Sequence, residues 1–263
     1  MILRTPVLSL AVLAGLVQAL AASCTYTVTA PPLTEPPVIR TTTTASVPLT
    51  QAPDPMRDGP DRGVIDQTWP AVARVTGLGC TASQVGTGFV AGEGLVVTVA
   101  HVVAGLSAPE VHLPDISQVA SIVAFNPVSD LAVLSVDTGS LRPLTLADGS
   151  PGQAVAILAF DEDGEPETTR SRVIRRVRAV GDDIYGEPGD GRDALELEAS
   201  VRSGNSGAPV VDEAGYAVGV VFSRTRGGIQ VAYAVQSTEV RTLLESALRN
   251  GGEPVDSGEC RPR

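Results

Sequence analysis

From Asp66 onward, Gly, Pro, Asn and Asp residues divide the chain into short apolar runs. About a dozen short strands separated by such turn residues are typical of an all-β barrel or sandwich. Aromatic residues make up only 3% of the chain, so we expect a core of Val, Ala and Leu. The predicted strands are 71–75, 87–91, 95–100, 119–125, 131–136, 154–158, 172–180, 195–198, 209–211, 217–222 and 229–234.

One helix is expected, at the C-terminal end of the domain. Ser237 is a suitable N-cap, and Gly251 follows the last apolar residue of the segment. A spacing of three and four residues places the apolar positions on one helix face. These positions are Val240, Leu243, Leu244 and Leu248.

The N-terminal residues are typical of an export signal. An apolar run of roughly 14 residues, 7–20, is too short for a comfortable membrane span but suits a signal peptide. Ala19-Leu20-Ala21 fits ordinary signal peptidase, whereas Leu20-Ala21-Ala22-Ser23-Cys24 is similar to a bacterial lipobox. We expect a lipoprotein-type signal peptide over 1–23, with a diacylglyceryl group on Cys24. An export signal with an incidental cysteine is the alternative.

Three cysteines are one too many for complete pairing in an exported protein. If Cys24 is lipidated, Cys80 and Cys260 remain as a natural disulfide that joins the start of the folded domain to its end. Closing a loop of about 180 residues contributes roughly 5 kcal/mol in the chain-entropy model, less any strain. The alternative is two free thiols, which an oxidising compartment disfavours.

The segment between the signal and the strands is rich in Thr and Pro, which supply nearly half of residues 25–60. Such a segment cannot bury enough apolar surface to offset its ordering entropy. We expect an extended tether over 24–62, with a reach of up to roughly 100 Å. The folded domain is then expected over 63–263.

The charge balance restricts the partners. Lys and Arg total 19 against 30 acidic residues, a formal charge of −11 that opposes binding to a nucleic-acid backbone. The sequence has two histidines and no Cys-x-x-Cys pair, so we expect neither a structural zinc site nor a cofactor. The acidic stretch 181–193 lacks the ligand alternation of an EF-hand, and we expect a solvated turn there rather than a calcium site.

Three residues have the chemistry of a nucleophilic active site. His101 ends an apolar strand, Asp130 opens another, and Ser206 lies on a glycine-flanked bend that leads into a third. A serine hydroxyl is a poor nucleophile until a base takes its proton, and the imidazole base needs an acid to fix its tautomer. The order His, Asp, Ser supplies these three roles.

This chain order discriminates between hydrolase folds. An α/β-hydrolase places its catalytic histidine after the serine, and neither histidine here follows Ser206. A subtilisin-like enzyme needs its aspartate before the histidine and an alternating α/β pattern. The acids before His101 lie in or beside the tether and helices are scarce, so only the chymotrypsin order remains.

The motifs resemble those of trypsin-like serine proteases with the chymotrypsin fold, in the bacterial HtrA-like branch without a PDZ domain. Within that branch the sequence is most similar to catalytic domains of the MarP type, which are periplasmic proteases of actinobacteria. The resemblance covers about residues 63–260 and includes the positions of Cys80 and Cys260. The matching segments are Gly86-Thr87-Gly88-Phe89-Val90, Ala100-His101-Val102-Val103, Ser129-Asp130-Leu131-Ala132-Val133-Leu134, Asp183-Ile184-Tyr185-Gly186 and Gly204-Asn205-Ser206-Gly207.

The resemblance implies two six-stranded antiparallel β-barrels followed by a C-terminal helix. His101 and Asp130 would come from the first barrel and Ser206 from the second, with the backbone N–H groups of Gly204 and Ser206 as the oxyanion hole. Two departures stand out. We expect the lipobox and tether to take the place of the membrane-spanning portion of the MarP type, and Ala208 stands where a glycine is usual.

Substrate preference is weakly encoded. Alignment with the family places Ser200 at the floor of the primary pocket, with Phe222, Ser223 and Tyr233 as walls. The pocket then has no acid for Lys or Arg, and we expect a small or medium apolar residue before the cut. His112 lies in a polar stretch and is expected on the surface.

The sequence therefore predicts an extracytoplasmic serine endopeptidase that acts on proteins or peptides and is anchored to the cell envelope by lipid. A soluble secreted or periplasmic form is the alternative location. The competing hypotheses are a catalytically silent or latent protease-like binding module and an esterase with the same triad. The intact triad argues against the binding module.

Overall fold

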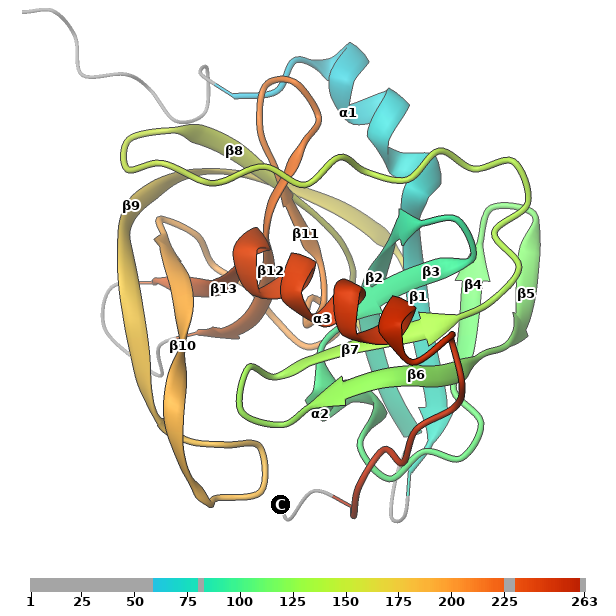
Figure 1. Cartoon of the computed structure of the whole chain (residues 1–263). Coiled ribbons are helices and arrows are strands. Elements are labelled where there is room, and N and C mark those ends of the chain that lie inside the picture. Colours follow the sequence, from blue (N-terminus) through green and yellow to red (C-terminus); the bar gives the residue numbers. More distant parts are fainter. Residues whose placement is uncertain (1–58, 80–82, 225–229, 261–263) are drawn as a thin grey trace, which may run out of the picture. The chain divides into compact units, whose positions relative to one another are not determined.

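The computed structural model describes residues 59–79, 83–224 and 230–260. These residues form mainly β-strands, so the predicted all-β class is confirmed (Figure 1). The elements of the first half are α1 (Arg62–Thr68), the 3-10 turn η1 (Trp69–Ala71), β1 (Val72–Leu78), β2 (Ser83–Gly92), β3 (Leu95–Thr98), α2 (Ala100–Val103), β4 (Glu110–Leu113), β5 (Ile116–Val119), β6 (Ser121–Asn126) and β7 (Leu131–Ser135). The second half contains β8 (Ala154–Phe160), β9 (Pro166–Asp182), β10 (Pro188–Leu197), β11 (Pro209–Val211), β12 (Ala217–Arg224), β13 (Ala232–Gln236) and α3 (Ser237–Arg249).

The strands form two curled antiparallel sheets. The second closes into the expected six-stranded barrel, in the order β10-β13-β12-β11-β8-β9. The first has seven strands in the order β5-β4-β1-β2-β3-β7-β6. It differs from the expected six because β4 and β5 form a short hairpin at the edge of the sheet, in which only Val111 and Leu113 are buried.

The structure has two large apolar cores, one for each sheet, and β8 contributes to both. Successive side chains of a strand point to opposite faces. Accordingly Ala156 and Leu158 pack in the core of the first sheet, whereas Val155, Ile157 and Ala159 pack in the core of the second. Nearly every β8 side chain is buried. The strand is therefore a wall shared by the two halves.

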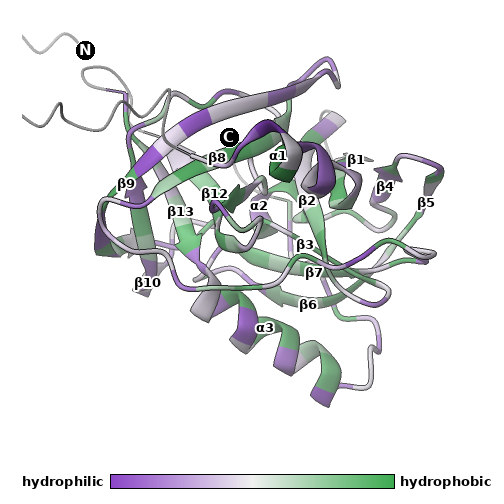
Figure 2. Cartoon of the chain, turned by 90° about the horizontal axis from the view of Figure 1, so that it is seen from above, coloured by the Kyte–Doolittle hydropathy of each residue, from purple (hydrophilic) through white to green (hydrophobic). Residues whose placement is uncertain are grey.

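The C-terminal helix α3 is present and packs against β6 and β7 (Figure 1). Its apolar and polar residues alternate in bands along the helix (Figure 2). Val240 and Leu243 are buried as expected, but Leu248 is 68% exposed. The prediction of Ser237 as N-cap is wrong, because Ser237 begins the helix and its Oγ donates to the buried carbonyl of Ala217 at 2.7 Å.

The observed strand ends differ most from the predicted ones where polar side chains obscure the alternation of apolar and polar residues along the strand. The strand predicted over 172–180 extends from Pro166 to Asp182 as β9, in which only Ser171 and Val173 are buried. The strand predicted over 229–234 is found as β13, three residues later at its start, and residue 229 lies outside the described ranges.

A buried threonine joins the two halves beside β8. Thr87 of β2 is fully buried, and its Oγ1 donates to the carbonyl of Gly204 at 2.8 Å. The same oxygen accepts the N–H of Phe160 at 2.9 Å. Thr98 Oγ1 in turn donates to the carbonyl of Thr87 at 2.7 Å. One hydroxyl thus satisfies two backbone groups of the second half from a strand of the first.

We predict that Thr87→Val lowers the free energy of unfolding by roughly 1–3 kcal/mol, since it keeps the shape but leaves two buried backbone groups unpaired. Denaturant unfolding followed by the fluorescence of Trp69, the single tryptophan, measures this. Thr87→Ser keeps the hydroxyl and should cost clearly less. Equal stabilities of the valine variant and the wild type would show that the bridge does not stabilise the fold.

Candidate active site

His101 and Asp130 meet because the strands that carry them are paired. His101 lies in α2, directly after β3, and Asp130 precedes β7. The antiparallel register Thr98↔Ala132 brings these two strand ends together. His101 Nδ1 lies 2.7 Å from Asp130 Oδ2, and the backbone N–H of His101 donates to Asp130 Oδ1 at 2.9 Å. Both carboxylate oxygens therefore have a partner on the histidine.

The turn before β7 orients Asp130. Among the described residues it is the one non-glycine residue with a positive φ, 56°. The Oδ1 of Asn126 supports the turn by accepting the N–H groups of Val128 and Ser129 at 2.9 and 3.0 Å. Aspartate tolerates this left-handed conformation better than most residues, and such strain concentrates at functional sites. Asp130 is only 3% exposed, so its carboxyl group is buried next to His101.

Ser206 lies in the loop between β10 and β11, against β2. Its carbonyl accepts the N–H of Thr87 at 2.7 Å. A Cβ added at Gly86 would lie within 3 Å of both Ser206 O and the Val102 side chain, which follows His101 in the chain. The serine loop is therefore packed close to α2. Within the described residues no hydrogen bond joins Ser206 to His101; such bonds often tighten only when substrate binds.

Gly207 permits this close packing. Its φ is +91°, and a Cβ there would lie 1.9 Å from the carbonyl oxygen of Thr87. The amides around it fall into two groups. Those of Asn205, Gly207 and Ala208 donate to backbone carbonyls. Those of Gly204 and Ser206 donate to no acceptor in the described part of the chain. Two backbone donors in the loop of this half-buried serine thus have no acceptor among the described residues.

A polar network joins the serine loop to β8 and β9. Asn205 Nδ2 donates to the carbonyl of Phe160 at 3.1 Å and to Glu167 Oε1 at 2.6 Å. Asn205 Oδ1 accepts the N–H of Arg202 at 2.8 Å. The Arg202 guanidinium in turn pairs with Glu167 and, at 3.2 Å, with Asp161. The asparagine before the serine is therefore fixed by β8, β9 and its own loop.

The Asp161 carboxyl in this network has a pKa below its ordinary value. The largest cause is the N–H of Glu165, which donates to Oδ1 at 2.8 Å; burial opposes this effect, and the charge of Arg202 adds to it. A lowered folded-state pKa means that the ionised form stabilises the fold above the unfolded value. This contribution is lost as the pH falls through the folded-state pKa.

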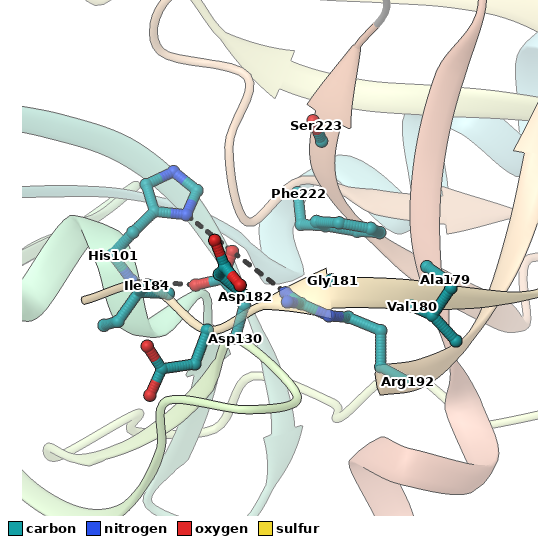
Figure 3. Close-up of a pocket in the computed structure, with 11 residues that line it drawn as sticks. His101, Asp130, Ala179, Val180, Gly181, Asp182, Ile184, Arg192, Phe222 and Ser223 are labelled. Atoms are coloured by element: carbon teal, nitrogen blue, oxygen red, sulfur yellow. Dashed lines mark hydrogen bonds and ion pairs between the residues drawn. The ribbon is translucent and has the colours of Figure 1, made fainter. Parts of the chain in front are cut away.

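A cavity of about 340 Å³ adjoins the histidine (Figure 3). Phe222 and Ser223 of β12, two of the predicted pocket residues, line it together with His101, Asp130, Arg192 and residues 179–184. Tyr233 is not among the lining residues but its ring centroid lies 6.5 Å from that of Phe222. Ser200 is exposed in the loop after β10 and does not line this cavity.

The remaining predicted residues lie elsewhere. Cys24 and Cys80 lie outside the described residues, and Cys260 is disulfide-bonded. His112 is half-buried in β4, where Nε2 contacts Thr76 Oγ1 at 2.9 Å and Nδ1 contacts Ser117 Oγ at 2.7 Å.

The acidic stretch 181–193 forms the β9–β10 hairpin. Asp183 Oδ1 accepts the N–H groups of Tyr185 and Glu187 there, at 2.8 and 3.0 Å. Across the described ranges no cluster of three His, Cys, Asp or Glu residues is suited to a metal ion. None of the helices that the structure describes has the length and apolar character needed to cross a bilayer.

Sequence reasoning did not single out two buried residues of this region. Thr87 appears only as part of a glycine-containing motif, and nothing in the sequence shows that its hydroxyl bridges the two halves. Arg192 lies in a polar stretch of the hairpin but is buried in the cavity beside Asp130. Gly189 and Gly191 beside it were the available signal, since isolated glycines in a strand often mark a bulge.

We predict that Asp161→Asn flattens the acid side of the stability profile. The wild type should lose stability relative to the variant as the pH falls below about 4, because the wild-type carboxylate must then be protonated. Thermal unfolding of both proteins between pH 7 and pH 3 measures this difference. Asp163→Asn is the matched control, since Asp163 contributes only its backbone N–H to the network. Parallel wild-type and Asp161→Asn profiles would contradict the assignment.

The comparisons with known proteins agree with this geometry. The model of the trypsin-like peptidase domain matches residues 86–220. The serine protease Rv3671c of Mycobacterium tuberculosis is 33% identical over 202 residues, which cover 75% of this chain and 50% of that protein. The “Probable periplasmic serine endoprotease DegP-like” of Brucella suis is 30% identical over 175 residues, covering 63% of this chain and 33% of that protein.

The solved structures give the same result. The crystal structure of the Rv3671c protease in its active form superposes with a TM-score of 0.71 at 32% identity, covering 77% of this chain and 93% of that chain. The chain spans about half the length, or less, of these curated relatives. The matched domain, the chymotrypsin-like fold and the shared sequence together show that this chain belongs to the family of trypsin-like peptidase domains.

Proposed function

We propose that the protein is a serine endopeptidase with the triad His101, Asp130 and Ser206, exported from the cell and anchored to the envelope by lipid. The observation that carries the catalytic part is the joint geometry of the site. A buried aspartate contacts His101 Nδ1, and the serine loop, which packs against the same helix, carries two amides with no acceptor among the described residues. This combination has the parts needed for acyl transfer.

In the proposed reaction, Ser206 Oγ attacks the carbonyl carbon of the scissile peptide while His101 Nε2 takes the hydroxyl proton. The carbonyl oxygen becomes an oxyanion, which accepts hydrogen bonds from the amides of Gly204 and Ser206, worth roughly 3–4 kcal/mol per donor. His101 gives its proton to the leaving amine as the C–N bond breaks. Water then attacks the acyl-enzyme by the same sequence, which releases the acid and restores Ser206.

Asp130 stabilises the transient imidazolium and holds the tautomer in which Nδ1 carries the proton. Its two contacts with His101 support this role, because one is made by the side chain and the other by the backbone. For the substrate, we propose a small or medium apolar residue before the cut. The absence of an acid at Ser200 favours this preference.

We predict that a fluorophosphonate probe labels the wild-type protein covalently and fails to label Ser206→Ala. The reason is that only a serine activated by a base reacts at a useful rate. Gel fluorescence and mass spectrometry of the labelled peptide provide the measurement. Ser203→Ala, an exposed serine of the same loop, is the matched control and should label normally.

No labelling of the folded wild-type protein would favour the protease-like binding module over the peptidase. Labelling with turnover of a simple ester but of no protein substrate would favour an esterase. Hydrolysis of casein and of short peptides with different residues before the cut separates these outcomes and measures the preference directly.

The anchoring part of the proposal is supported by the sequence. The apolar run before Cys24 has the length of a signal peptide, and the Thr- and Pro-rich segment after it suits a tether that separates the domain from the membrane. Lipidation of Cys24 leaves Cys80 as the partner of Cys260, which is disulfide-bonded. Pairing at these positions and export to an oxidising compartment are mutually consistent.

We predict that the full-length protein, expressed in a bacterium that processes lipoproteins, partitions with the membranes, and that Cys24→Ala releases it into the soluble fraction. Detergent phase partition and intact mass measure the anchor and the added diacylglycerol. Digestion without reductant should yield a peptide pair linked through Cys80 and Cys260. A soluble, unmodified wild-type protein that begins near residue 22 would instead support ordinary signal cleavage.

A further inference from the structure

A buried arginine from the second barrel reaches the carboxylate of the first. Arg192 lies on β10 just after a break in the β9 register between Gly189 and Arg192. Gly191 adopts φ +79°, and a Cβ there would lie 2.4 Å from the carbonyl oxygen of Ala179. Such a bulge re-aims the following side chain. Here it turns Arg192 into the cavity beside His101 rather than toward solvent (Figure 3).

The surroundings of Arg192 are those of a fixed charge. The residue is 8% exposed, and its guanidinium carbon lies 4.8 Å from the ring centroid of Phe222 (Figure 3). Its Nη1 lies 3.7 Å from Asp130 Oδ2. Its buried Nε has no hydrogen-bond partner in the part of the chain that the structure describes. The side chain is thus held by packing, by a cation–π contact and by one carboxylate.

The charged groups around this pair come from four elements. Asp130 lies in the turn before β7, Asp182 and Asp183 lie at the end of β9 and in the following turn, and Glu239 lies on α3. Burial lowers the pKa of Arg192, while Asp130, Asp183 and Glu239 act in the opposite direction. Arginine remains protonated through the working pH range of proteins. Arg192 therefore supplies a permanent positive charge next to the triad.

We propose that Arg192 is a positioning residue that holds the Asp130 carboxylate across the two barrels and extends the activity of His101 as a base toward lower pH. The predicted change in catalysis rests on the proposed peptidase function. The predicted effect of the Arg192 charge on protonation of His101 does not, because it follows from geometry alone.

The direction in which Arg192 affects protonation of His101 follows from the carboxylate oxygen that both residues contact. Asp130 Oδ2 lies 2.7 Å from His101 Nδ1 and 3.7 Å from Arg192 Nη1. The two nitrogens are therefore within roughly 6 to 7 Å of each other, a range over which charges in a poorly solvated site interact strongly. A positive charge at this distance opposes protonation of the imidazole. Removing it should make the imidazolium easier to form and move the acidic limb of the pH profile upward.

The test compares Arg192→Met, which removes the charge at similar volume, with Arg192→Lys, which keeps a charge. Arg249→Met is the matched control, because Arg249 is exposed at the end of α3 and lies outside the site. For each protein, kcat and KM are measured between pH 4 and pH 9 on one peptide ester. In Arg192→Met the acidic limb of kcat/KM should move up by roughly 1 pH unit. The plateau kcat should fall several-fold, with KM within about twofold.

Proton NMR gives a readout that does not need turnover. The protein has only two histidines, so His112→Gln leaves a single imidazole signal to follow. In that background Arg192→Met should raise the midpoint of the His101 titration by roughly 1 pH unit. Arg192→Lys should leave it near the wild-type position. An inactive wild type whose His101 midpoint still responds in this way would contradict the peptidase proposal and leave the electrostatic role of Arg192 intact.

An unchanged His101 midpoint in folded Arg192→Met would overturn the inference. A tenfold rise in KM with an unmoved acidic limb would also overturn it and assign Arg192 to binding an acidic substrate group. If Arg192→Met does not fold, Arg192→Lys decides alone. The midpoint of the His101 titration in Arg192→Lys must stay near the wild-type value. A shift as large as that expected for loss of the charge would reject the positioning role of Arg192.

Discussion

The buried hydrogen-bonded contact between Asp130 and His101 is the one around which the rest of the site is organised. A carboxylate that is 3% exposed costs several kcal/mol to bury unless donors and positive charge compensate it. Two donors come from one residue, His101, because β3 and β7 end side by side. The left-handed backbone of Asp130 is tolerated because it delivers the carboxylate to those donors.

The serine loop is positioned by a different kind of constraint. In the part of the chain that the structure describes, no ion pair joins it to α2; instead its backbone is joined to β2 through Thr87 and supported by the side chain of Asn205. Backbone hydrogen bonds of this kind fix a loop while leaving selected amides unpaired. The hydrogen bonds are unevenly distributed over this loop, since the amides of Gly204 and Ser206 lack protein acceptors among the described residues. Uncommitted donors in a fixed loop are the preorganisation that stabilises developing negative charge.

Much of the fold was accessible from the sequence, because strands such as 87–91 and 131–136 combine apolar residues with clear turn signals. The short β4–β5 hairpin was missed because the alternation around His112 spans only four residues on each side of a turn. Ser237 was assigned to a cap that its hydroxyl does not make, because Ala217, a tertiary neighbour, accepts its proton. The motif residues around His101, Asp130 and Ser206 were found together, and their catalytic roles remain predictions. The glycines beside Arg192 indicate a bulge, but only the three-dimensional structure shows where its side chain points.

The division of β8 between two cores bears on how the molecule assembles. A fragment that ends before residue 154 would lack Ala156 and Leu158, together with the residues of β11–β13 and α3 that pack in the same core, and would leave the N-terminal core open. A fragment that begins at residue 154 would expose these same apolar side chains to solvent, because the strands that cover them would be missing. The two pieces would then be complementary in shape, so reconstitution from separate fragments should depend on the strand being intact. Each half of the protein is, in this sense, completed by its neighbour, and the cleft between them forms only when both have folded.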